Sequence, residues 1–434
     1  MTALGIALLA LAPAAPAADA GATDVLAIRG GRIVTVSGPV IENGTVLVSG
    51  GRITAVGASV EVPPGATVID ATGQTVYPGL IDGLTTLGLT EVGSVPGSVD
   101  TTETGDVNPH AEAWIAVNPH SELLPVARAN GVTAALAAPA GGLVSGQSAL
   151  LRLAGTTPEA LTVKTPVAMH MVYPTGRPAF DISRLFEEPE LKTFEERQKE
   201  RKRNQERELK RLGNLLEEAK AYGAARAAAR AGTVAPPRPD LPMEALAPVA
   251  RGELPVVMRV DVEEDIRGAL KFAEEHGLQL VVAGGLEAWR VADLLKQKGV
   301  AVLVNVDRLP RRQSDPYDAA YANPAALQRA GVRFAIVSDD ASQSRNLPYE
   351  AAMARAYGLD ADAALRAITL SPAEIFGVAG RMGSIAAGRD ADLFVATGDI
   401  MDPRTEVTHV LIDGRPQPLE TRHTRLYEQF KNRP

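Results

Sequence analysis

The chain lacks cysteine altogether, has few aromatic residues (4%) and carries no excess of basic residues over its 434 positions. The absence of cysteine excludes disulfide bonds, thiolate metal sites and a cysteine nucleophile. The 44 Lys and Arg against 52 Asp and Glu give a net charge of −8, so a nucleic-acid-binding role is not expected. Since 45% of the residues are hydrophobic, the chain is long enough to bury a large core.

Long apolar runs are also missing beyond the N-terminus, and none reaches the ~18 to 20 residues that a membrane span needs. Residues 3–12 are small and apolar, and an Ala- and Pro-rich stretch with an Ala-x-Ala-like site follows them. This form is typical of a secretory signal peptide, so we predict a leader over residues 1–22 and a periplasmic or secreted protein. A basic segment is missing in front of the run, which points to a start codon further upstream. The alternative is a disordered Ala/Pro tail.

Short strands and tight turns dominate both ends of the chain. Residues 24–77 contain apolar runs of four to six residues separated by Gly30-Gly31, Gly50-Gly51 and Gly73, and residues 385–420 have the same texture. We therefore predict a composite β-sandwich built from residues 24–77 plus 385–420.

Apolar strands alternate with helical patterns between these two segments, over residues 78–384. The strands, such as "LQLVVAGG" and "VAVLVNV", are nearly continuous in apolar residues, as expected for a parallel sheet that is covered on both faces. Repeated units of this kind and this length predict a (β/α)8 TIM barrel. A doubly wound open sheet is the alternative, but the Gly-x-Gly-x-x-Gly of a dinucleotide fold is absent.

Residues 182–242 interrupt this rhythm. They contain a stretch dense in Glu, Lys, Arg and Ala that predicts one long helix with many i,i+4 charge pairs, followed by a Pro-rich segment. We interpret the stretch as a charged helical insertion on the surface. A lid or an oligomer contact across the barrel mouth is the functional alternative.

Two motifs carry a resemblance to a known family. The run Tyr77-Pro78-Gly79-Leu80-Ile81-Asp82 resembles the Pro-Gly-Leu-Ile-Asp-x-His-x-His signature of the metal-dependent amidohydrolase superfamily, and residues 383–393 resemble its "GSI-x-x-G-x-x-ADL" motif. The imidazolonepropionase-like branch is the most similar. The resemblance implies a barrel with a composite β-domain and hydrolysis of non-peptide, cyclic amide-type C–N bonds.

The positions that hold the metal in that family carry other residues here. Leu84 and Thr86 stand where the resemblance implies the two histidines of the first strand, and Gly284 stands where it implies a later one. Leucine and glycine donate nothing to a cation, whereas zinc needs N, O or S ligands. No clear bridging lysine emerges, since Lys164 lies in a loop-like stretch. We predict no metal site of the family's kind and no cofactor.

The remaining polar residues of these strands suggest a rebuilt site. Asp339 aligns with the family's last aspartate, and Arg259 with Asp261 occupies the place of another histidine. We predict Asp339 as a general base and Arg259 as an oxyanion stabiliser. His170, His110 and Asp261 are candidate substrate-binding residues, although a structural, hydrogen-bonded role suits His170 as well.

These observations leave two hypotheses for function. In the first, the protein is an amidohydrolase-family hydrolase whose activity is reduced, metal-independent or absent. In the second, it is a non-catalytic pseudoenzyme that binds a ligand or acts as the partner subunit of an active paralogue. The expected partners are a small amide-type ligand and a homo-oligomer or a paralogous subunit, with no nucleic acid and no membrane span.

Overall fold

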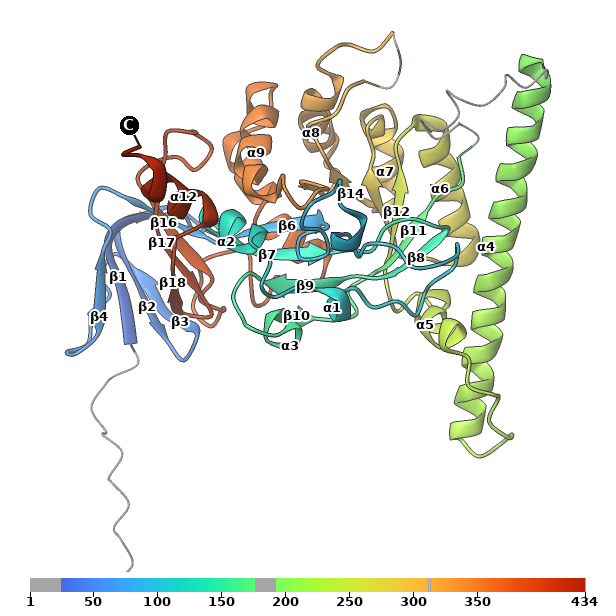
Figure 1. Cartoon of the computed structure of the whole chain (residues 1–434), viewed down its shortest axis with the longest axis horizontal. Coiled ribbons are helices and arrows are strands. Elements are labelled where there is room, and N and C mark those ends of the chain that lie inside the picture. Colours follow the sequence, from blue (N-terminus) through green and yellow to red (C-terminus); the bar gives the residue numbers. More distant parts are fainter. Residues whose placement is uncertain (1–24, 176–192, 311, 313, 434) are drawn as a thin grey trace, which may run out of the picture.

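The computed structural model describes residues 25–175, 193–310, 312 and 314–433. The predicted leader over residues 1–22 and residues 182–192 of the predicted insertion lie outside these ranges. The described chain has a mixed α/β fold (Figure 1). None of the described helices is long and apolar enough to cross a bilayer.

One sheet combines strands from both ends of the described chain. Its order is β18-β17-β16-β5-β1-β2-β3, and β4 pairs with β1. The junction is antiparallel, since Leu393 in β16 faces Pro78 in β5. The strands are β1 (Val25–Ile33), β2 (Ile41–Ser49), β3 (Arg52–Gly57), β4 (Thr67–Asp70), β5 (Thr75–Pro78), β16 (Leu393–Ala396), β17 (Val407–Ile412) and β18 (Arg415–Gln417). The pairing of both ends agrees with the sequence pattern, and a two-layered sandwich stays a prediction.

The central strands form two further sheets in the described residues. Their orders are β10-β9-β7-β6 and β15-β14-β13-β12-β11-β8, with parallel pairing from β11 to β15. The strands are β6 (Leu80–Thr85), β7 (Val132–Ala137), β8 (Val144–Gln147), β9 (Ala149–Arg152), β10 (Thr162–Lys164), β11 (Met169–Val172), β12 (Val256–Val260), β13 (Leu280–Gly284), β14 (Ala301–Val304) and β15 (Phe334–Ile336).

The two central sheets meet where β15 approaches β6. The backbone N–H of Asp339 donates to the carbonyl of Leu84 over 2.9 Å, so the chain beyond β15 is held against the first central strand. The described strands form no single closed sheet. A closed (β/α)8 barrel therefore stays a prediction.

Helices cover these sheets and follow the strands along the chain. The helix after β12, α6, begins with three acidic residues and ends at His276 before Gly277, whose φ of 67° is the left-handed conformation that glycine adopts readily. The helices of the region are α1 (Ala113–Ala116), α2 (Leu123–Arg128), α3 (Pro158–Leu161), α6 (Glu263–His276), α7 (Ala292–Lys298), α8 (Ala319–Ala330), α9 (Leu347–Ala356), α10 (Ala361–Ala367) and α11 (Leu370–Ile375). Short 3-10 turns lie at Pro96–Ser98, Ala288–Val291 and Ser344–Asn346, and α12 (Arg422–Phe430) comes last.

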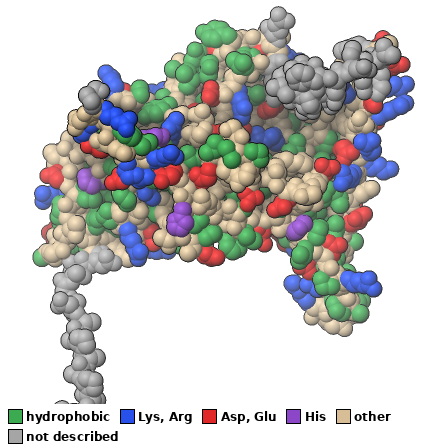
Figure 2. All heavy atoms as spheres, viewed as in Figure 1, with side chains coloured by type: hydrophobic (Ala, Val, Ile, Leu, Met, Phe, Trp, Pro, Cys, Tyr) green, Lys and Arg blue, Asp and Glu red, His purple; other side chains and the backbone are tan. Residues whose placement is uncertain are grey.

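The charged stretch forms one helix, α4 (Phe194–Arg230), as the sequence predicts. Thr193 and Glu196 cap its start with reciprocal hydrogen bonds. Leu212, Leu216 and Ala219 are buried, and α5 (Leu241–Ala250) packs beside the helix. Figure 1 places α4 at the end of the molecule remote from the β1–β4 strands, with its ends projecting past the body. In Figure 2 acidic and basic side chains are interspersed over the visible face.

Candidate functional site

A pocket of ≈ 750 Å³ lies at the carboxyl ends of the parallel strands. Arg259 belongs to β12, Gly284 ends β13, Asn305 follows β14 and Asp339 follows β15. This edge is where α/β folds with parallel strands place their functional residues. The lining residues are Arg259, Asp261, Gly284, Leu286, Asn305, Asp307, Arg308, Leu309, Pro310 and Asp339.

A double ion pair is the main charged feature of this pocket. Arg259 donates from Nη1 and Nη2 to the two carboxylate oxygens of Asp339, over 2.7 and 2.5 Å. Arg308 donates from Nη2 to Oδ2 of the same carboxylate over 2.8 Å. The hydrogen bond to Asp339 and its negative charge raise the pKa of Arg259 above its ordinary value. The Asp339 side chain is 9% exposed, against 43% and 48% for the two arginines, so the cationic groups face the solvent.

The structure thus brings together the two predicted catalytic residues. It also gives Asp339 an unusual backbone, with a φ of 58°, and fixes its N–H on Leu84. Such left-handed non-glycine residues are uncommon and need support from their surroundings. Here the support comes from the bond to β6 and from the two guanidinium groups.

Of the positions where the family places metal ligands, Leu84 and Gly284 have no donor atom and Thr86 has only a neutral hydroxyl. Leu84 is buried in β6, and Thr86 follows directly after that strand. A Cβ added at Gly284 would lie 2.3 Å from Oδ1 of Asp261, and φ at Gly284 is +89°. The Asp261 carboxylate therefore occupies the space that a side chain at 284 would need. The described residues contain no group of three or more His, Cys, Asp or Glu that could hold a metal ion.

His170 is buried on β11 and does not line the pocket. Burial, and to a smaller extent the charge of Arg259, lower its pKa to about 3, and the charge of Asp339 acts in the opposite direction. The ring is therefore neutral near pH 7. Its Nε2 is buried without a hydrogen-bond partner among the described residues. His170 is thus an interior residue whose pKa responds to the charges of Arg259 and Asp339.

A buried carboxyl pair lies close to the pocket. Asp82 accepts hydrogen bonds from Ser338 and Ser344, and burial nevertheless raises its pKa to about 6. Glu350 on α9 has its pKa raised to about 9, first by burial and then by the charges of Asp82 and Asp307. Glu350 is therefore a neutral acid at pH 7. Among the charged groups, Asp82 has the largest effect on the pKa of Glu350.

The other sequence candidates lie elsewhere or were not predicted. His110 is exposed in the loop between β6 and β7, and it does not line the pocket. Lys164 donates from Nζ to the carbonyl of Phe376 over 2.8 Å, and it does not line the pocket. Sequence reasoning missed Arg308 and Asn305. The signal that points to them is the polar run directly after the strand "AVLV", in "NVDR".

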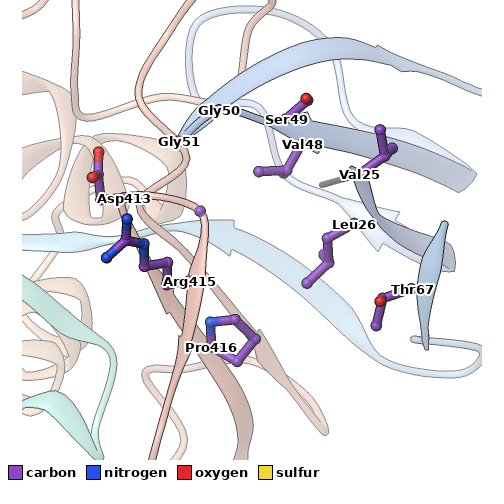
Figure 3. A pocket seen from close by; sticks show the side chains of 11 residues that line it. Val25, Leu26, Val48, Ser49, Gly50, Gly51, Thr67, Asp413, Arg415 and Pro416 are labelled. Atoms are coloured by element: carbon purple, nitrogen blue, oxygen red, sulfur yellow. The ribbon is translucent and has the colours of Figure 1, made fainter. Parts of the chain in front are cut away.

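A second pocket, of ≈ 450 Å³, lies between strands of the eight-stranded sheet (Figure 3). Figure 3 shows Asp413 and Arg415 on one side of it and the small apolar Val25, Leu26 and Val48 on the other. Asp413 is held by Arg152 over 3.1 Å. This pocket offers no acid–base pair and no cluster of convergent polar groups, so the pocket at Asp339 is the better candidate.

Comparisons with known proteins agree with the motifs. The amidohydrolase family matches residues 131–416 of the chain. The amidohydrolase tasK of Hapsidospora irregularis is 25% identical over 405 residues, which are 86% of this chain and 40% of that protein. The chain thus spans about 40% of the length of this relative.

Solved structures give the same picture. An amidohydrolase from Thermotoga maritima MSB8 is 27% identical, covers 90% of this chain and 99% of its own, and superposes with a TM-score of 0.78. A prolidase complexed with N-methylphosphonate-L-proline is 18% identical, covers 91% of this chain and 99% of its own, and has a TM-score of 0.51, which speaks for the fold alone. Because the family match extends over more than half of the sequence, the chain belongs to the amidohydrolase family.

Proposed function

We propose that this chain binds a small amide-type ligand in the pocket at Asp339 without the catalytic metal of its family. Hydrolysis of C–N bonds, the general reaction of the family, is then reduced or absent. The observation that carries the proposal is the double ion pair, in which Arg259 and Arg308 engage both oxygens of Asp339.

The charges of this cluster oppose a divalent cation. Asp339 would have to release two guanidinium groups before it bound a metal, and both groups would repel that metal. At about 4 Å and an effective dielectric constant of about 20, two unit charges interact by about 4 kcal/mol, and a dication doubles this. Leu84 and Gly284 supply no replacement donors. The donor set does not fit a metal of the family's kind, and no reaction step is routed through one.

A metal-independent hydrolysis is the second candidate. Its support is the contact between the two groups that such a reaction needs, a carboxylate as general base and a guanidinium as oxyanion stabiliser. The same contact occupies the base, because both carboxylate oxygens of Asp339 already accept hydrogen bonds from guanidinium groups. We therefore place ligand binding first.

The first experiment measures the metal content of the purified protein by mass spectrometry and titrates it with Zn²⁺ and Mn²⁺. A screen of cyclic amides such as 2-pyrrolidinone, with and without chelator, accompanies it. We expect far less than one metal per chain and no effect of the chelator. Stoichiometric metal or chelator-sensitive turnover would refute the proposal.

Asp339→Asn separates the two candidates. If metal-free turnover is present and this variant abolishes it, whereas exposed Asp360→Asn leaves it intact, the base role of Asp339 is supported. If ligand binding is measurable and no turnover accompanies it in either protein, binding is the function.

A further inference from the structure

The pocket exposes positive charge at the two guanidinium groups that bind Asp339. Arg259 and Arg308 are nearly half exposed, whereas the carboxylate between them is almost covered. A guanidinium has five N–H donors. Arg308 donates one hydrogen bond, from Nη2 to Asp339. Within the described part of the chain, its Nε and Nη1 groups donate none. These donors are available to a ligand.

A carboxylate matches such donors best. It accepts two parallel N–H bonds from a guanidinium, and charge-assisted bonds of this kind are about twice as strong as neutral ones. Besides Asp339, which the arginines pair, two acidic residues of the lining oppose an anion. The negative charge of Asp261 raises the pKa of Arg259, so the positive charge of Arg259 already offsets part of it. Asp307 is exposed beside Arg308 and is the acid that a bound carboxylate would meet.

An apolar wall adjoins the arginines. Leu286 is buried at the pocket, and Leu309, next to Arg308 in the chain, is 83% exposed. A large apolar side chain left this open at a pocket rim is a surface that a ligand covers favourably, at roughly 25 cal/mol per Å². The pocket thus sets a cation beside an apolar surface, with Pro310 completing it.

We propose that the ligand is an amide that carries both a carboxylate and an aliphatic group. Arg308, with Arg259 beside it, binds the carboxylate, and Leu286 and Leu309 cover the aliphatic group. This assignment of a ligand class rests on the proposed function, since it uses the same metal-free pocket.

Isothermal titration of the full chain with three probes tests the proposal. The probes are N-acetyl-L-leucine, its uncharged amide N-acetyl-L-leucinamide, and N-acetylglycine, which lacks the aliphatic group. We expect N-acetyl-L-leucine to bind at least about tenfold more tightly than either of the others. Equal affinity for the acid and its amide overturns the carboxylate assignment, and equal affinity for the leucine and glycine compounds overturns the apolar one.

Four variants assign the effect to residues. Arg308→Gln should remove the preference for the acid, Arg308→Lys should keep part of it, and Asp307→Asn should tighten binding of the acid. Arg415→Gln removes a positive charge at the remote pocket of Figure 3 and should change nothing. A preference that survives Arg308→Gln in a folded protein contradicts the proposal.

The outcomes also separate this inference from the proposed function. If the acid and the amide bind equally and without metal, the ligand class is wrong and the metal-free amide site stands. If none of the three probes binds, both are overturned. If turnover depends on added metal, the metal-free site is wrong regardless of the preference.

Discussion

Replacing Glu350 by glutamine should stabilise the protein, and increasingly so as the pH rises. Glu350 is 7% exposed, and its pKa is raised from 4.5 to about 9, chiefly because burial penalises the charged form. Between these two pH values the native chain retains a proton that the unfolded chain has lost. Native stability that this group contributes is therefore complete below pH 4.5 and is lost as the pH rises towards 9.

The size of the effect follows from the pKa difference. Each pH unit above 4.5 costs ~1.4 kcal/mol of stability until the native group itself ionises. The cost is about 1 kcal/mol at pH 5 and roughly 3 kcal/mol at pH 7. Glutamine is neutral in both states and carries no such cost. The stability advantage of Glu350→Gln over wild type should therefore grow by about 2 to 3 kcal/mol from pH 5 to pH 7.

Urea unfolding followed by tryptophan fluorescence measures this difference at several pH values from 5 to 8. The slope of free energy against urea should stay constant, so that the midpoint reports stability. Exposed Glu61→Gln serves as the control and should run parallel to wild type. Parallel stability curves for Glu350→Gln and wild type over this range would show that Glu350 is ionised in the native chain and refute the reasoning.

Three further perturbations test other parts of the structure. His170→Gln should flatten the loss of stability on acidification from pH 6.5 to about 3, because the unfolded histidine takes up a proton there and the buried one does not; urea titrations at pH 4 and 7 measure this. Gly284→Ala should lower stability by at least about 1 to 2 kcal/mol from its positive φ, and more from contact with Asp261, so an unchanged urea midpoint contradicts the geometry. Arg152→Met leaves the buried Asp392 without its cation, whereas Asp390 keeps its ion pair with Arg381, and should cost roughly 3 to 5 kcal/mol in the same assay, with a loss below 1 kcal/mol speaking against a structural role.

Local patterns predicted much of the fold. The charged stretch predicted α4, because i,i+4 spacing of Glu with Lys or Arg supports a helix wherever it lies. The acidic start of α6 and the glycine after His276 follow local rules of the same kind, since caps involve residues only a few positions apart. The nearly continuous apolar strands predicted the buried parallel pairing from β12 to β14.

The candidate site was predicted in part. Arg259 lies near the end of β12 and Asp339 follows β15, so their meeting at one sheet edge could be expected from the order of the strands. Arg308 was missed because it lies four residues beyond β14, in a loop whose path no local pattern encodes. His110 lies in the loop after β6, and this loop places it at the surface, outside the pocket.

Local sequence patterns indicated the apolar strands, the long charged helix and the chemical groups missing from the metal positions. The tertiary structure alone decided that Ser338 would donate to Asp82 across 256 positions of sequence, that Glu350 would become a neutral acid beside them, and that a second arginine would reach Asp339. The physical reason is range. Backbone hydrogen bonding and side-chain periodicity depend on near neighbours, whereas burial, and the charge states that follow from it, depend on which distant segments pack together.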